Sequence, residues 1–209
     1  MSLFQQTVLT TAYLPPVEYF WAIAAADAVY IEQHETYQKQ SYRSRCRIYA
    51  AGGVETLSIP VLCAATHKLP VRDVRIDYGD PWLMRHKRAL EASYNSSAFF
   101  EYYRDELYAV LDRREPFLFD LNLRLLEVLL RMTGLRREIR LTDHYEPDAG
   151  AGDFRARIQP KYRGESLLAE YKKEKTYFQV FSAGASFIPN LSVIDLLCAE
   201  GPDAISYLL

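Results

Sequence analysis

The first thirty-three residues alternate strand and helix signals in a way that leaves few folds open. Residues 7–14, "TVLTTAYL", are rich in β-forming side chains and end at Pro15 and Pro16, which cannot continue a strand ladder. Residues 17–27, "VEYFWAIAAAD", place apolar side chains at helical spacing, and residues 28–33, "AVYIEQ", have the pattern of a short buried strand. Strand, short helix and strand predict a βαβ unit with two parallel neighbouring strands.

A β-hairpin is predicted next. From Tyr42 to Tyr49 the side chains alternate, so that Arg43, Arg45 and Arg47 should point away from the apolar face of the strand. The sequence "AAGG" then favours a turn, and "VETLSIPV" alternates again. If the two apolar faces coincide, the arginines lie beside Thr56 and Ser58.

Helical patterns fill much of the rest of the chain. Three segments carry them, over residues 81–94, 99–114 and 118–135, and the third, apolar almost all round, should be buried and end near Gly134. Residues 136–165 are polar and are expected to form loops. A last helix should start at Asn190 as N-cap and run through Leu197. "VRDVRID", residues 71–77, is expected to be another strand.

These patterns predict an α/β fold: a mainly parallel sheet with an N-terminal βαβ unit, an appended β-hairpin and a helical layer. A chain of 209 residues is long enough for one sizeable core and short for two domains, so residues 1–209 are predicted to form a single domain. The net charge of −2 argues against a general nucleic-acid binder, and any basic site must be local.

The sequence also indicates the cellular compartment. Three cysteines without a C-x-x-C pair suggest a reducing compartment. The amino terminus has no signal-peptide pattern, and no apolar run approaches the roughly 20 residues of a membrane span. We therefore expect a cytoplasmic protein without a membrane partner.

The alternating arginines are the first candidate site. Side chains two residues apart on a strand lie ~6.6 Å apart, close enough for Arg43, Arg45 and Arg47 to share one polyanionic ligand. Lys39 could add a mobile charge. The alternative is a solvated face, or ion pairs with Glu32, Glu35 or Asp77.

Candidate proton carriers come next. His34 and Glu35 follow the second predicted strand, where ligands of parallel sheets bind, so His34 could shuttle a proton with Glu35 as base or orienting partner. An exposed loop pair is the alternative. His86 is a third candidate for proton transfer. Its alternative is a packed, hydrogen-bonded histidine at the core edge, which is the more usual role of a histidine with Trp82 and Leu90 four residues to either side.

Two asparagines introduce apolar helices. Asn122 and Asn190 are explained by capping, yet a helix amino terminus behind small residues, here Ser182, Gly184 and Ser186, can also bind an anion. His67 and His144 show no ligand spacing, so no metal site is predicted, and nothing in the pattern calls for a cofactor.

Six segments together resemble the WbqC-like family of bacterial proteins, often encoded among genes for O-antigen and other surface polysaccharides. They occur in the same order: "AYLPPVEYF", "YQKQSYRSRCRI", "LSIPV", "WLMRHKRALEASYNSSAFFEYY", "FDLNLRLLEVLLRMTGL" and "FIPNLSVIDLLCAEGP". The resemblance implies a role with polysaccharide precursors or nucleotide sugars. The placement of Tyr13 in the first segment makes it a substrate-binding candidate.

Two departures set this chain apart from longer members. Their opening His-Gln-Pro-x-Tyr-Leu-Pro is replaced here by Thr10 and Thr11 ahead of Ala12-Tyr13-Leu14-Pro15. Their extra α/β segment before the carboxy-terminal block is replaced by the shorter residues 136–165. This compact form thus lacks the family's opening histidine.

Three functions follow as hypotheses. The first is a transferase acting on a nucleotide-activated amino sugar or similar polysaccharide precursor, a small anionic ligand held by Lys39, Arg43 and Arg45. The second is a non-enzymatic ligand-binding or assembly protein using the same basic patch. The third is a structural partner in which helices rich in tyrosine, of which the chain has 16, pair with another copy. Whether the protein is an enzyme stays open.

Overall fold

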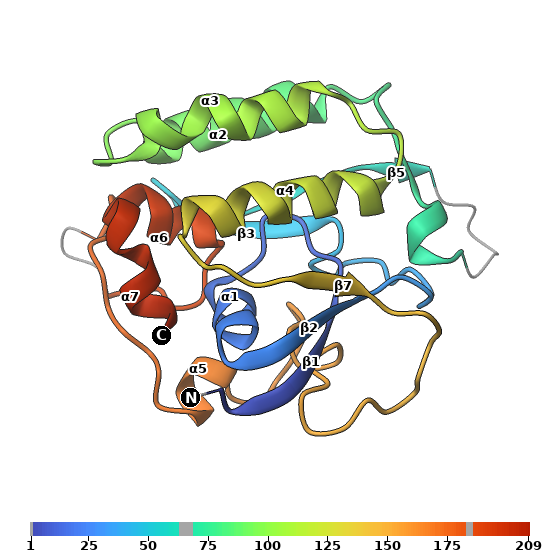
Figure 1. The fold of residues 1–209 in the computed structure, drawn as a ribbon. Coiled ribbons are helices and arrows are strands. Elements are labelled where there is room, and N and C mark those ends of the chain that lie inside the picture. Colours follow the sequence, from blue (N-terminus) through green and yellow to red (C-terminus); the bar gives the residue numbers. More distant parts are fainter. Residues whose placement is uncertain (1, 63–68, 183–185) are drawn as a thin grey trace.

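The predicted βαβ unit is present in the computed structural model, which describes residues 2–62, 69–182 and 186–209. Strand β1 (Phe4–Thr10) and strand β2 (Ala26–Glu32) pair in parallel and are joined by helix α1 (Val17–Ala24). All eight residues of α1 are buried, because the sheet lies on one side of it and the carboxy-terminal helices lie on the other (Figure 1).

A third parallel strand completes the sheet. Strand β7 (Ile139–Leu141) pairs with β2, which gives the order β1-β2-β7. On the outer edge of β1, Asp153 forms an isolated parallel bridge with Val8. Both additions come from the segment predicted to be loops. The carboxyl ends of the three strands therefore lie at one edge of the sheet, toward the right in Figure 1.

The hairpin is also confirmed. Strands β3 (Arg45–Ala50) and β4 (Gly53–Ser58) pair antiparallel, with Arg45 opposite Ser58 and Arg47 opposite Thr56 as predicted. The expectation that Arg43 belongs to this strand is wrong, because the strand begins at Arg45. Residues 71–77 differ as well: Val71–Asp73 form a 3₁₀ turn and only Arg75–Ile76 form a strand, instead of one longer strand.

The short elements between the hairpin and the helices are these: β5 (Val61–Leu62), η1 (Val71–Asp73) and β6 (Arg75–Ile76). The helical layer follows as α2 (Trp82–Tyr94), α3 (Phe100–Asp112) and α4 (Leu118–Met132). Helices α2 and α3 pack together on the outside, and α4 lies beneath α3, between it and the sheet (Figure 1). Helix α4 is largely buried, as predicted, and ends at Met132, two residues before Gly134, whose φ of 71° suits the left-handed position that follows a helix.

The chain closes on α1 with short helices: α5 (Leu167–Glu170), α6 (Val193–Glu200), η2 (Gly201–Asp203) and α7 (Ala204–Leu208). Their apolar faces join α1, the sheet and the helical layer in a continuous hydrophobic cluster. The fold class is α/β, with a parallel sheet, an antiparallel hairpin and a helical layer. Within the described parts of the chain, no helix has the length and apolar character needed to cross a membrane.

Candidate functional site at the carboxyl edge of the sheet

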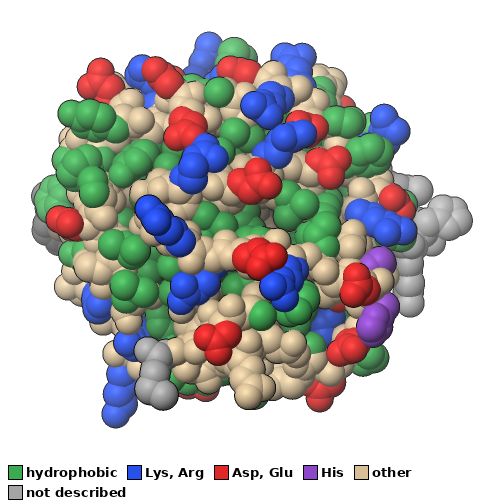
Figure 2. All heavy atoms as spheres, in the orientation of Figure 1, with side chains coloured by type: hydrophobic (Ala, Val, Ile, Leu, Met, Phe, Trp, Pro, Cys, Tyr) green, Lys and Arg blue, Asp and Glu red, His purple; other side chains and the backbone are tan. Residues whose placement is uncertain are grey.

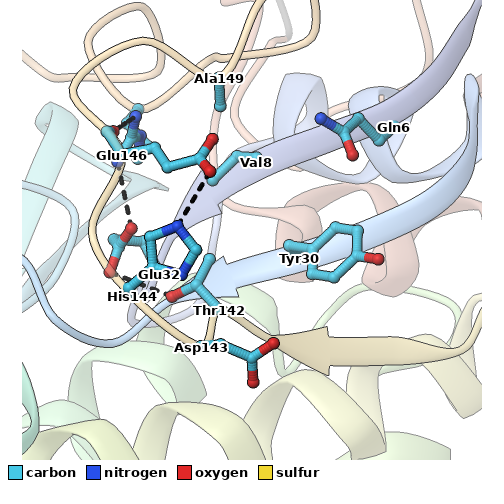
Figure 3. A pocket seen from close by; sticks show the side chains of 10 residues that line it. Gln6, Val8, Tyr30, Glu32, Thr142, Asp143, His144, Glu146 and Ala149 are labelled. Atoms are coloured by element: carbon cyan, nitrogen blue, oxygen red, sulfur yellow. Dashed lines mark hydrogen bonds and ion pairs between the residues drawn. The ribbon is translucent and has the colours of Figure 1, made fainter.

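A hollow of about 150 Å³ opens where the parallel strands end, and we call it the sheet-edge hollow. Its walls carry polar and ionisable side chains from both the strands and the loop after β7 (Figure 3). The ones used below are Glu32, Thr142, Asp143, His144, Glu146 and Arg155. Parallel sheets place ligands at this edge, because the chain leaves every strand there and loops can surround the space.

Arg155 ties the loop to the sheet. Its guanidinium donates to Asp153 at 2.8 Å, to the carboxylate of Glu32 at 3.1 Å and to the carbonyl of Glu146 at 2.6 Å. Glu32 is 1% exposed and also accepts from the Thr142 hydroxyl at 3.1 Å. Every one of these charges has a partner, which is the condition for keeping them out of water. The network fixes the floor of the hollow.

His144 and Glu146 face each other above that floor (Figure 3). The imidazole Nε2 lies 3.0 Å from Oε1 of Glu146. Since an ionised carboxylate only accepts, Nε2 carries the proton and Nδ1 is the nitrogen that can take one up. The His144 side chain is 72% exposed, so a ligand can reach it. In Figure 2, histidine side chains stand beside acidic ones at the right-hand edge, the side where β2 and β7 end.

His34 also reaches this edge. Its Nε2 donates to the carbonyl of Thr142 at 3.0 Å, and its backbone N–H donates to Glu32 at 2.6 Å. The position predicted from the strand end is therefore correct, and Nδ1 of His34 is free to accept a proton. Its role as a proton carrier stays a prediction.

Glu35, by contrast, turns inward to Arg43. The two groups form a bidentate ion pair, with Nε of Arg43 2.8 Å from Glu35 Oε1. Arg43 therefore follows the alternative given above, in which the arginines pair with acids of the protein itself. Asn122 donates to the Arg43 carbonyl at 2.8 Å. The Arg43 Nη1 and the Asn122 Oδ1 are buried without a hydrogen-bond partner among the described residues. Three predicted site residues thus meet in the interior.

The remaining basic candidates, Arg45, Arg47 and Lys39, do not share the buried position of Arg43. Arg45 and Arg47 are half-buried on the hairpin, and Arg47 hydrogen-bonds Tyr42. Neither forms an ion pair with a carboxylate in the described part of the chain. Lys39 is exposed on the loop after β2, beside a second hollow. The arginine ribbon is therefore reduced to two side chains, and its ligand stays a prediction.

Tyr13 and His86 are brought together in the core. The Tyr13 hydroxyl lies 3.0 Å from Nδ1 of His86, and the exposed fractions are 0% and 4%. Burial lowers the pKa of His86 to about 4, with a backbone hydrogen bond at Ser58 acting the other way. This environment fits the interpretation of His86 as a packed histidine at the edge of the core. Substrate-binding and proton-transfer roles for this pair stay predictions, and the burial argues against them.

Asn190 caps a different helix from the one predicted. Ser192 is the N-cap of α6, and Asn190 instead accepts at 3.0 Å from the backbone N–H of Glu18 in the first turn of α1. Pro16, the N-cap of α1, offers no side-chain acceptor, so a residue from far along the chain fills the role. Of the small residues before Asn190, Gly184 lies outside the described residues.

Sequence reasoning missed most of the sheet-edge hollow. Thr142, His144, Glu146 and Arg155 lie in the segment read as a polar loop, and Glu32 was considered only as an ion-pair partner. The available signal was a run of titratable side chains after "IRL", a strand too short to recognise. Among the described residues, no group of three side chains could hold a metal ion, and His67 lies outside them.

Comparisons with known proteins agree with the resemblance. A model of the WbqC-like protein family matches residues 11–171, and the chain belongs to this family. The chain is also 27% identical over 222 aligned residues to the uncharacterized protein Rv1507c of Mycobacterium tuberculosis (strain ATCC 25618 / H37Rv), covering 96% of each. No solved structure matches the chain.

Proposed function

We propose that the protein is a transferase that acts on a nucleotide-activated amino sugar or another precursor of a surface polysaccharide. The observation that carries this proposal is the composition of the sheet-edge hollow: three carboxylates, an imidazole and two hydroxyls line a space of about 150 Å³. Carboxylates accept hydrogen bonds from sugar hydroxyls and from an ammonium group. The family membership supports the same setting.

His144 is the group placed to move a proton. Its Nδ1 can take the proton that an amino or hydroxyl group of the sugar loses as it attacks the acyl carbon of a donor, while Glu146 stabilises the imidazolium that results. The new bond to the acyl carbon replaces the bond to the donor's carrier, and the imidazolium can return the proton to the carrier as it leaves. His34 is the second candidate at the same edge. The volume of the hollow is below the roughly 300 Å³ of pockets that enclose a whole ligand, so it suits one end of the substrate.

The test has two stages. A ligand that binds only the folded state raises its thermal stability, so UDP-glucosamine should raise the melting temperature more than UDP-glucose or UDP does. Mass spectrometry with a panel of acyl and aminoacyl donors then detects a modified sugar nucleotide. His144→Gln and Glu146→Gln should abolish conversion, whereas Glu138→Gln, an exposed glutamate paired with Arg140, should not. Arg45→Ala tests the basic strand: an unchanged ligand shift removes it from the site.

The second candidate is a non-enzymatic ligand-binding protein. It is favoured by the strand-to-helix junction, where Thr10 and Thr11 are buried and the Thr11 hydroxyl has no partner in the part of the chain that the structure describes. The histidine that longer family members carry in this opening is replaced by threonine here, which would remove a proton carrier and leave a site that only binds. Thermal stabilisation by a sugar nucleotide with no conversion by any donor would support this second function over the first.

A further inference from the structure

A second hollow, of about 310 Å³, carries only basic and neutral residues, and we call it the basic hollow. Lys39 reaches it from the loop after β2, and Lys161 and Arg163 reach it from the segment after Arg155. Of the residues that the structure describes, no aspartate or glutamate lines it. Gln38, Gln40 and Gln159 add amide groups that can donate hydrogen bonds.

These three cations are uncompensated. All are exposed, and none forms an ion pair in the described part of the chain. On the same segment, Arg155 and Arg157 are both paired with carboxylates. A protein of net charge −2 has acids enough to pair them, so three free cations around one concavity create a local positive potential.

The two loops that carry the cations are held in place. The Ser41 hydroxyl donates to the Gln38 carbonyl at 2.6 Å, which closes the turn around Lys39. The Tyr162 ring, between Lys161 and Arg163, lies 5.2 Å from the Arg157 guanidinium. It also packs on Gly164, where an added Cβ would lie 2.5 Å from the tyrosine hydroxyl. A ligand therefore meets cations whose backbone is already ordered.

The basic hollow adjoins the sheet-edge hollow through the chain itself. Arg155 lines one and the next residue, Ala156, lines the other. Gln159, on the wall of the basic hollow, donates to the Arg155 carbonyl at 2.8 Å. A precursor that reaches both hollows would place its sugar in the first and its phosphates in the second.

We propose that the basic hollow binds the diphosphate of the nucleotide-activated precursor, with Lys39, Lys161 and Arg163 as its ligands. This inference rests on the proposed function for the identity of the precursor, but the anion site is testable alone. A diphosphate diester carries two negative charges. Arginine holds phosphate oxygens in bidentate fashion and lysine supplies point charges, so the three cations suffice to neutralise both charges of such a group.

The experiment is calorimetric titration of UDP and of inorganic pyrophosphate into the wild type and two triple variants. Lys39→Gln/Lys161→Gln/Arg163→Gln removes the site. Arg113→Gln/Arg136→Gln/Lys172→Gln is the control, because it removes three exposed, unpaired charges outside the hollow. A charge-assisted contact changes Kd by about tenfold, so the first variant should weaken binding at least about a hundredfold and the control less than threefold, roughly. Thermal unfolding confirms that both variants fold.

The outcomes separate this inference from the proposed function. The basic hollow is not a phosphate site if the wild type binds neither UDP nor pyrophosphate. It is also not one if the variant without Lys39, Lys161 and Arg163 keeps the affinity of the wild type. If a sugar nucleotide is nevertheless converted, the proposed function stands with the phosphate bound elsewhere. If pyrophosphate binding depends on the three cations and no sugar nucleotide is preferred over UDP, the anion site stands and the proposed function fails.

Discussion

Arg43 and Glu35 hold opposite charges almost out of reach of water, since their exposed fractions are 1% and 6%. Such a pair contributes little net stability, because desolvation of both ions offsets their attraction. Losing one partner is costly, because the other charge then stays buried alone. The pair therefore fixes a geometry, in which the loop after β2 is bound to the start of the hairpin.

A double-mutant cycle tests this at the residue scale. Arg43→Met should lower the free energy of unfolding by about 3–5 kcal/mol, since the Glu35 carboxylate remains buried without a counter-ion. Adding Glu35→Leu should recover most of the loss. Denaturant unfolding gives the loss of free energy for each single variant and for the double variant. If the loss in the double variant equals the sum of the two single losses, the pair is not coupled.

His86 gives the protein a defined response to acid. Burial lowers its pKa in the folded state to about 4, whereas in the unfolded chain it returns to 6.5. Between these values only the unfolded state takes up the proton, so the stability contributed by neutral His86 is lost as pH falls through this window. The full shift corresponds to ~3 kcal/mol.

We expect the wild type to lose more unfolding free energy between pH 7 and pH 4 than His86→Gln loses. Glutamine keeps hydrogen-bonding groups and does not titrate, so the difference between the two pH profiles isolates the histidine. Parallel profiles would show that His86 is accessible to protons in the folded state, which would return it to the catalytic candidates.

At the scale of elements, the segment after β7 decides the candidate site. It turns back along β1, where the Gly152 carbonyl accepts from the Val8 N–H at 3.0 Å and from the Thr7 hydroxyl at 2.9 Å. Only glycine fits there, because an added Cβ would lie 1.9 Å from the Gln6 carbonyl oxygen. This approach places Arg155 against Glu32.

Gly152→Ala should therefore push the segment off β1 and lower the free energy of unfolding by about 1–3 kcal/mol. Gly52→Ala is the matched control, since nothing lies within 4 Å of its added Cβ. Hydrogen exchange should show faster exchange at residues 149–155 in the first variant only. Equal protection in both would mean that the backbone adjusts without releasing the site.

At the scale of the whole molecule, the single domain spanning residues 1–209 stays a prediction. The continuous hydrophobic cluster supports it, because α1, the hairpin and α4 all contribute buried side chains. We expect one cooperative thermal transition, with near-UV and far-UV circular dichroism coinciding and the calorimetric enthalpy equal to the van't Hoff value. An earlier, separate melting of α2 and α3 would divide the chain into two units.

The homo-oligomer through tyrosine-rich helices also stays a prediction. Tyr102 on α3 is 79% exposed, but its exposed neighbours on that helix include Glu101, Asp105 and Glu106. Asp105 and Glu106 are paired with Arg104 and Arg131, so the surface around Tyr102 is charged and not apolar. Tyr103 and Tyr108 are half-buried against the molecule itself, as expected of tyrosine at a core edge.

The sequence alone determined the βαβ unit, the hairpin with its register and the three long helices, because periodicity and turn residues act over a few neighbours. It also located His34 at the strand end. Only the tertiary structure decided the partners of the charges: that Arg43 meets Glu35, that Asn190 caps α1, and that Arg155 closes on Glu32. Such pairings depend on distances between segments remote in the chain, which the spacing of residues along it does not contain.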